Sequence, residues 1–159
     1  MNILQAIGFA AKTAGVNPSL LLAICMHETG LKNVNNYNDG GSHSHGVCQV
    51  KVGTAKHMGK VFKIKKLQEV SGDDLGDTTT NALAAAFYLK YQFKRYDGDT
   101  CKAVAAYNAG SFKESSVYPG TPFNWKYVKK VKDSAQEGSK AQSRLKCLDE
   151  SVFIATTQD

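Results

Sequence analysis

The stretch that most constrains the fold runs from Asn17 to Gln49. Asn17-Pro18 is a helix-start signal, with Asn as the cap and Pro in the first turn. An apolar run follows and Gly30 ends it, so the pattern predicts a helix over residues 18–29. The composition of residues 32–45 is polar and glycine-rich, which predicts a surface loop or a small hairpin.

One carboxylate, Glu28, lies where the apolar helix meets the polar segment. Burial disfavours the charged form of a carboxylate, so this position predicts a raised pKa for Glu28, as a general acid requires near neutral pH. The alternative is a glutamate that faces solvent at a helix end. Thr29 follows, and its hydroxyl is able to hydrogen-bond Glu28. The residues alone leave both interpretations open.

The remaining pattern is mostly helical. A β-biased piece is expected over residues 46–50, directly after the polar segment. Apolar periodicity and capping residues predict helices or helical turns at residues 3–14, 54–58, 64–70, 77–95, 101–109, 124–136 and 140–149. The predicted fold is therefore mainly α with one small β element.

Length and composition predict one domain with one core, because the chain has 159 residues of which 42% are hydrophobic. No run is long enough to span a membrane. The first residues lack a basic start and a cleavage site, so we expect an amphipathic helix there and no signal peptide.

The charge is basic, with 20 Lys and Arg against 14 Asp and Glu. Nucleic acid, an anionic membrane surface or an anionic polymer such as a bacterial cell wall suits this balance, and so does a solvated lysine-rich surface. The lysine clusters lack the interleaved aromatic residues and module signatures of nucleic-acid binders, so no nucleic-acid partner is expected.

Four cysteines permit two disulfides: Cys25, Cys48, Cys101 and Cys147. Their wide spacing and the missing export signal favour reduced thiols in the core. Cys48 near a histidine also suggests a cysteine nucleophile, a weaker interpretation because no third orienting group is evident.

The polar segment itself offers two further kinds of site. His43 and His45 with Asp39 nearby suggest zinc, but no second ligand pair has zinc spacing, so a polar loop is favoured and no metal is expected. Asp39 is also the candidate for a second carboxylate, which an inverting glycosidase places roughly 6.5–9.5 Å from the acid. Asn38-Asp39-Gly40 is typical of a turn, and we prefer that interpretation.

A second distinctive stretch is Ala106-Tyr107-Asn108-Ala109-Gly110. It places a phenol and an amide at the end of a predicted helix. They either pack and cap that helix, or bind an acetamido sugar at the edge of a cleft. Tyr88 is a candidate for the same role.

In their order and spacing, these residues resemble the catalytic domain of soluble lytic transglycosylases, in the lysozyme-like superfamily with goose-type lysozymes. The resemblance covers about residues 15–131 and implies a single α+β lysozyme-like domain over residues 1–159, with a helical extension at 132–159. It rests on these segments: Glu28-Thr29, Gly46-Val47-Cys48-Gln49, Asn81-Ala82, Tyr88-Leu89 and Ala105 to Gly110.

The resemblance implies cleavage of the MurNAc-β-1,4-GlcNAc bond of peptidoglycan, with 1,6-anhydromuramyl products and no cofactor. Glu28 is then the only catalytic acid and base, oriented by Thr29. Cys48 replaces a methionine of the family and offers a smaller apolar contact to the sugar. The expected binding residues are Thr29, Cys48, Gln49, Tyr88, Tyr107 and Asn108.

Two other functions remain open: a hydrolytic lysozyme that uses Asp39 to activate water, and a non-catalytic wall-binding protein. The expected partner is the glycan strand, without membrane insertion, and the expected state is a monomer. The expected setting is the cell wall or periplasm, reached by a bacteriophage lysin or virion-associated enzyme. The alternative is a bacterial periplasmic enzyme.

Overall fold

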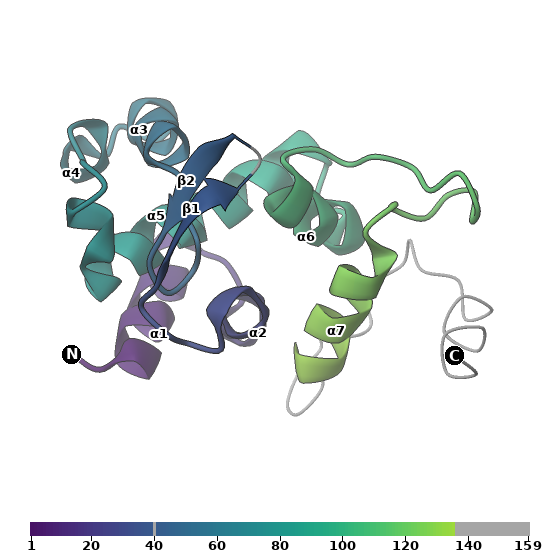
Figure 1. Cartoon of the computed structure of the whole chain (residues 1–159), viewed down its shortest axis with the longest axis horizontal. Coiled ribbons are helices and arrows are strands. Elements are labelled where there is room, and N and C mark those ends of the chain that lie inside the picture. Colours follow the sequence, from purple (N-terminus) through teal and green to yellow (C-terminus); the bar gives the residue numbers. More distant parts are fainter. Residues whose placement is uncertain (40, 136–159) are drawn as a thin grey trace. The chain divides into compact units, whose positions relative to one another are not determined.

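The mainly α fold with a small hairpin is confirmed by the computed structural model, which describes residues 1–39 and 41–135 (Figure 1). The elements in chain order are α1 (Ile3–Ala14), α2 (Pro18–Thr29), β1 (Asn35–Asp39), β2 (Ser42–His45), α3 (Val52–Val61), α4 (Lys65–Gln68), the 3₁₀ turn η1 (Asp74–Gly76), α5 (Thr78–Arg95), α6 (Thr100–Ala109) and α7 (Trp125–Ala135).

The chain forms two compact units, one of residues 1–91 and one that begins at Gln92. The single domain over 1–159 stays a prediction. The helix expected at 140–149 lies outside the described residues. No helix in the described ranges is long and apolar enough to cross a membrane.

Helices α1 and α2 pack together in the first unit, and both begin at asparagine caps. The Asn17 side chain accepts a hydrogen bond from the Leu20 N–H at 3.1 Å. Gly30 ends α2 with φ of 67°, a left-handed conformation that glycine adopts without strain. The helix predicted at residues 18–29 is therefore confirmed, and its apolar run lies in the core, with Leu20, Leu21 and Ile24 buried.

Strands β1 and β2 form an antiparallel hairpin, the second of the two predictions for residues 32–45. Asn35 lies opposite His45 and Asn36 opposite Ser44, with an irregularity before Asp39. The β-biased piece expected at 46–50 is confirmed only at Val50, which forms a bridge with His45, whereas residues 46–49 form a turn. Gly46 and Gln49 have φ of 75° and 52°, and an extended strand has no residues in that region.

Helix α5 begins at Asp77, whose carboxylate accepts hydrogen bonds from the Thr80 N–H at 3.0 Å and the Thr80 hydroxyl at 2.8 Å. This is the cap that the sequence predicts. Helix α3 is longer than the turn predicted at 54–58. It packs against α4, which falls within the predicted 64–70.

In the second unit, α6 begins at the predicted cap Asp99 and packs against α7. Val128 and Val131 of α7 are buried, as their helical spacing predicts. Gly110 ends α6 in a left-handed conformation. The segment between the two helices is irregular, as its proline and glycine content predicts.

Candidate active site

Glu28 lies half-buried in the last turn of α2. The core side of this helix is closed, because Ile24 and Cys25 are fully buried. The Gly30 N–H donates to the Met26 carbonyl at 2.7 Å, which ends the helix two residues after Glu28. The carboxylate is therefore carried on a rigid element at the edge of the core.

Thr29 fastens this end of α2 to the turn at 46–49. Its hydroxyl donates to the Val47 carbonyl at 2.7 Å and accepts from the Lys32 N–H at 3.1 Å. A hydroxyl has one hydrogen to donate, and here the short bond to Val47 uses it. The Thr29 hydroxyl therefore holds the turn that carries Gln49, and its expected role in orienting Glu28 stays a prediction.

A disulfide joins Cys25 of α2 to Cys48 of the same turn. The prediction of reduced thiols was therefore wrong, and Cys101 is disulfide-bonded as well. Cys48 is fully buried and its sulfur is bonded, which excludes both the cysteine nucleophile and the expected apolar contact with a sugar. Cys48 instead holds the turn against the helix that carries Glu28.

Asn81 is the residue of this site whose role the sequence interpretation missed. It is fully buried at the start of α5, where its amide nitrogen donates to the carbonyls of His45 at 2.7 Å and Leu75 at 2.9 Å. Its oxygen accepts from the Cys48 N–H at 2.9 Å. A Cβ at Gly46 would clash with this amide. The sequence analysis noted Asn81 only within the family resemblance, and the available signal was an amide residue early in an alanine-rich helix.

Gln49 is half-buried in the turn, in a left-handed conformation that is uncommon for residues other than glycine. Its amide nitrogen donates to the Val34 and Gly46 carbonyls, each at 2.9 Å. These bonds fix the orientation of the side chain and involve only its nitrogen, so the amide oxygen has a defined direction.

Asp39 ends β1, where its backbone pairs with Ser42. Its role as a second carboxylate stays a prediction. His43 and His45 lie on β2 with ring centroids 6.5 Å apart. Within residues 1–39 and 41–135, no three His, Cys, Asp or Glu side chains cluster closely enough to hold a metal ion.

The aromatic and amide candidates lie on α5 and α6. Tyr88 is half-buried on α5 in the first unit, and its ring stacks near that of Tyr91 with an interplanar angle of 13°. Tyr107 and Asn108 belong to the second unit. Tyr107 is buried, whereas Asn108 is exposed and its oxygen accepts from the Asn124 amide at 3.1 Å. Asn124 also donates to the Ala105 carbonyl at 3.0 Å.

Two other carboxylates have lowered pKa values for structural reasons. The Thr80 hydroxyl, and then its N–H, lower the pKa of Asp77, and bonds from Ser71 lower the pKa of Asp74. Asp77 accepts its hydrogen bonds as a helix cap, and Asp74 accepts its hydrogen bonds within a turn. Their lowered pKa values keep both groups ionised at neutral pH, which suits a structural role and not the role of a general acid.

Comparison with known proteins matches this chain to one family. Residues 5–119, most of the chain, match the family described as the transglycosylase SLT domain. A structure of an inactive mutant of the lytic transglycosylase Slt from Pseudomonas aeruginosa is similar with a TM-score of 0.58 and 20% identity, over 97% of this chain and 24% of that one. This likeness shows a shared fold, and this chain spans about a quarter of that enzyme's length. The chain belongs to the transglycosylase SLT domain family.

Proposed function

We propose that this protein is a peptidoglycan lytic transglycosylase in which Glu28 is the only catalytic carboxylate. The observation that carries the proposal is the position of Glu28, half-buried at the end of α2 in a chain that matches the family over residues 5–119. Half-burial and the partial negative charge at a helix C-terminus both disfavour a carboxylate's charge, as a general acid requires. The mutant of the similar Pseudomonas enzyme, a glutamate-to-glutamine change, is described as inactive.

In the proposed reaction, the Glu28 carboxylic acid gives its proton to the glycosidic oxygen between MurNAc and GlcNAc. The bond from C1 to that oxygen breaks, and its electron pair stays with the oxygen. The acetamido group of the substrate stabilises the cationic C1. The Glu28 carboxylate then takes the proton of the C6 hydroxyl, whose oxygen bonds to C1 and closes the 1,6-anhydro ring. No water is consumed, so no second carboxylate is needed.

The polar and aromatic candidates of each unit would bind the sugars. Gln49 is suited to accept a hydrogen bond through its amide oxygen, because its nitrogen is held by the Val34 and Gly46 carbonyls. Asn108 has the converse arrangement, since its oxygen accepts from Asn124 and its nitrogen is able to donate. Tyr88 and Tyr107 would contribute ring surface. Thr29 and Cys48 would act as positioning residues through the turn.

The proposed place of action is the cell wall, reached as a bacteriophage lysin or virion-associated enzyme. A bacterial periplasmic enzyme is the alternative. The net charge of +6 suits an anionic wall. The disulfide between Cys25 and Cys48 suits an oxidising compartment outside the cytoplasm.

The test is mass spectrometry of the muropeptides that wild type and Glu28→Gln release from purified walls. Wild type is expected to yield 1,6-anhydromuramyl ends, and Glu28→Gln is expected to be slower by about 10²–10⁴-fold, the usual contribution of a general acid. Glu69→Gln, at an exposed glutamate after α4, is the matched control and is expected to retain activity.

Reducing ends would instead support the hydrolytic function, with Asp39→Asn as the next variant. Full activity in Glu28→Gln would rule out the proposed acid. Walls that are bound but never cleaved would support a non-catalytic binding protein.

A further inference from the structure

The net positive charge of the chain comes from one segment, residues 40–68. The whole chain has 20 Lys and Arg against 14 Asp and Glu. Residues 40–68 contain six of the lysines and no acidic residue, so the rest of the chain has 14 basic and 14 acidic residues. The net charge of +6 is therefore the charge of this segment alone. Its lysines are Lys51, Lys56, Lys60, Lys63, Lys65 and Lys66.

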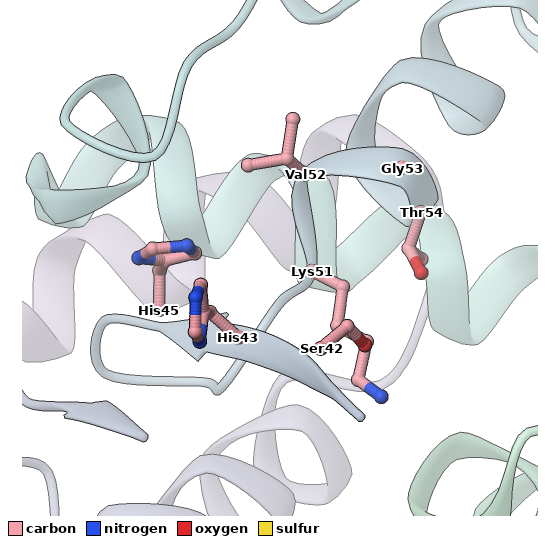
Figure 2. Close-up of a pocket in the computed structure, with 7 residues that line it drawn as sticks. All are labelled: Ser42, His43, His45, Lys51, Val52, Gly53 and Thr54. Carbon is pink, nitrogen blue, oxygen red and sulfur yellow. The ribbon is translucent and has the colours of Figure 1, made fainter. Parts of the chain in front are cut away.

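Most of these lysines lie on the surface of α3, of α4 and of the short connection between them. Lys51 is half-buried before α3, where it and His45 line a pocket of about 470 Å³ between β2 and the start of that helix (Figure 2). The five lysines of residues 56–66 are all exposed. The charge of the segment is therefore presented to solvent by two neighbouring helices.

Helices α3 and α4 are held firmly together. A Cβ at Gly59 would lie 2.7 Å from the backbone nitrogen of Gln68, so only glycine allows the two helices to approach this closely. The Gln68 side-chain amide donates to the Gly59 carbonyl at 3.1 Å, and the Ile64 N–H donates to the same carbonyl at 2.8 Å. The backbone positions that carry the lysines are therefore fixed relative to one another.

Four of the exposed lysines have no ion-pair partner within residues 1–39 and 41–135, and we call them the lysine surface: Lys56, Lys60, Lys63 and Lys65. Lys66 is left out because it lines another pocket together with Asp73, Asp74 and Asp77. Lys56 and Lys60 are one turn apart on α3, and like charges at this spacing destabilise a helix. The lysine surface therefore suits a partner that carries negative charges.

The residue types indicate what kind of anionic partner fits. Lysine is a strongly hydrated point charge, whereas arginine binds single carboxylates or phosphates with two parallel hydrogen bonds, and both arginines of the chain lie outside residues 40–68. Phe62 is the only Phe, Tyr or Trp in the segment, and its ring contacts Phe87 and the Lys90 ammonium. No aromatic ring is therefore presented for stacking on bases, as binders of single-stranded nucleic acid require. A polymer with many spaced negative charges fits better.

We propose that the lysine surface docks the protein on peptidoglycan by attracting the carboxylates of the peptide stems. The choice of partner rests on the proposed function, because the stems supply the negative charges of that substrate. None of the four lysines belongs to the residues proposed for catalysis or sugar binding. A surface of one charge sign raises the local concentration of an oppositely charged partner. The lysine surface therefore strengthens binding to the wall and leaves the bond-breaking step unchanged.

The test is sedimentation of the protein with purified peptidoglycan sacculi at about 0.05 M salt, with Glu28→Gln in every protein so that binding is measured without cleavage. Replacing the four residues of the lysine surface by Gln is expected to weaken binding by at least about tenfold. At about 1 M salt, where charges are screened beyond roughly 3 Å, the difference is expected to disappear.

Four exposed lysines elsewhere in the chain provide the matched control: Lys12, Lys113, Lys126 and Lys130. Replacing these by Gln gives the same net charge and is expected to weaken binding by less than about twofold, since the lysine surface is intact. Sacculi whose carboxylates have been converted to neutral amides are expected to bind the unaltered lysine surface no better than native sacculi bind the variant without it.

Equal loss of binding in the two fourfold variants would overturn the proposal, because total charge would then explain the affinity. Unchanged binding to the amidated sacculi would show that the stem carboxylates are not the partner. Tighter binding of a short DNA duplex than of sacculi, through the same four lysines, would show a nucleic-acid surface instead.

The proposed function can fail separately from this inference. Release of 1,6-anhydromuropeptides by wild type, together with binding that does not depend on the lysine surface, would overturn the docking role alone. Binding that depends on the lysine surface, in a wild-type protein that never cleaves the wall, would overturn the catalytic function alone.

Discussion

Helices α2 and α6 end in the same way, and each carries a proposed site residue two positions before its final glycine. Gly30 and Gly110 have φ of 67° and 86°. Each donates its N–H to the carbonyl four residues earlier at 2.7 Å. Glu28 and Asn108 thus occupy equivalent positions in the last turns of their helices.

The two helix ends differ in how they are held. The end of α2 is joined to the turn at 46–49 by the Cys25–Cys48 disulfide and by Thr29, and Asn81 holds that turn from the core. The end of α6 is held by side chains near the surface: Asn124 contacts Asn108, and Arg95 donates to the Gly110 carbonyl at 2.8 Å. The same local structure is therefore fixed firmly where the proposed acid lies and more loosely where the proposed sugar-binding amide lies.

The largest effect is expected for Asn81→Ala. The substitution leaves the Leu75 carbonyl and the Cys48 N–H without their present partner, and each such buried group costs about 1–3 kcal/mol, whereas the His45 carbonyl keeps its bond from the Val50 N–H. We expect a loss of about 4 kcal/mol in the free energy of unfolding, measured by chemical denaturation. Asn38→Ala, at an exposed position of the hairpin, is the control and should cost less than about 0.5 kcal/mol.

Removal of the disulfide tests the covalent part of the comparison. The sequence separation of Cys25 and Cys48 is 23, and a loop of this size predicts a loss of about 3 kcal/mol in Cys25→Ala/Cys48→Ala. Mutation is preferable to a reductant, because Cys101 is disulfide-bonded too. A shift in the midpoint of thermal unfolding equivalent to less than about 1 kcal/mol would show that the hydrogen bonds alone fix the turn.

Asn124→Ala tests the looser helix end. It removes bonds of 3.0 and 3.1 Å to Ala105 and Asn108, but it also removes a buried Asn124 oxygen that has no partner among the described residues. The two effects partly cancel, so we expect a loss of about 1 kcal/mol by the same denaturation measurement. A loss as large as that of Asn81→Ala would contradict the contrast between the two ends.

The smallest effect concerns Asp77, which caps the helix that carries Asn81. The Thr80 hydroxyl and then its N–H lower the pKa of Asp77 below its ordinary value of 3.8. The folded state then favours the carboxylate, so this stabilisation is present above pH 3.8 and is lost as the pH falls through the lower folded pKa.

The measurement is the unfolding midpoint of wild type and Asp77→Asn between pH 7 and about pH 2.5. Asn is also a good cap but does not titrate, so Asp77→Asn should lose less stability on acidification. Parallel curves for the two proteins would show that the cap does not contribute to acid sensitivity.

Local signals predicted the helices well. Asn17, Asp77 and Asp99 all cap helices as expected, because a cap depends only on residues three positions away. Predictions that depend on residues far apart in the chain failed, because local signals carry no information about such contacts. Val47 favours a strand, yet residues 46–49 form a turn because Thr29, Cys25 and Asn81, all distant in the chain, hold them there.

The sequence by itself determined the helical architecture and the placement of Glu28 at the end of an apolar helix, because these follow from helical periodicity, capping residues and composition. For residues 32–45 it left a loop and a hairpin both open. The tertiary structure decided which cysteines pair, that Thr29 acts on the turn and that Asn81 holds it. It also placed His45 and the start of α3 around one pocket. These features depend on contacts between segments far apart in the chain, and no local spacing encodes such contacts.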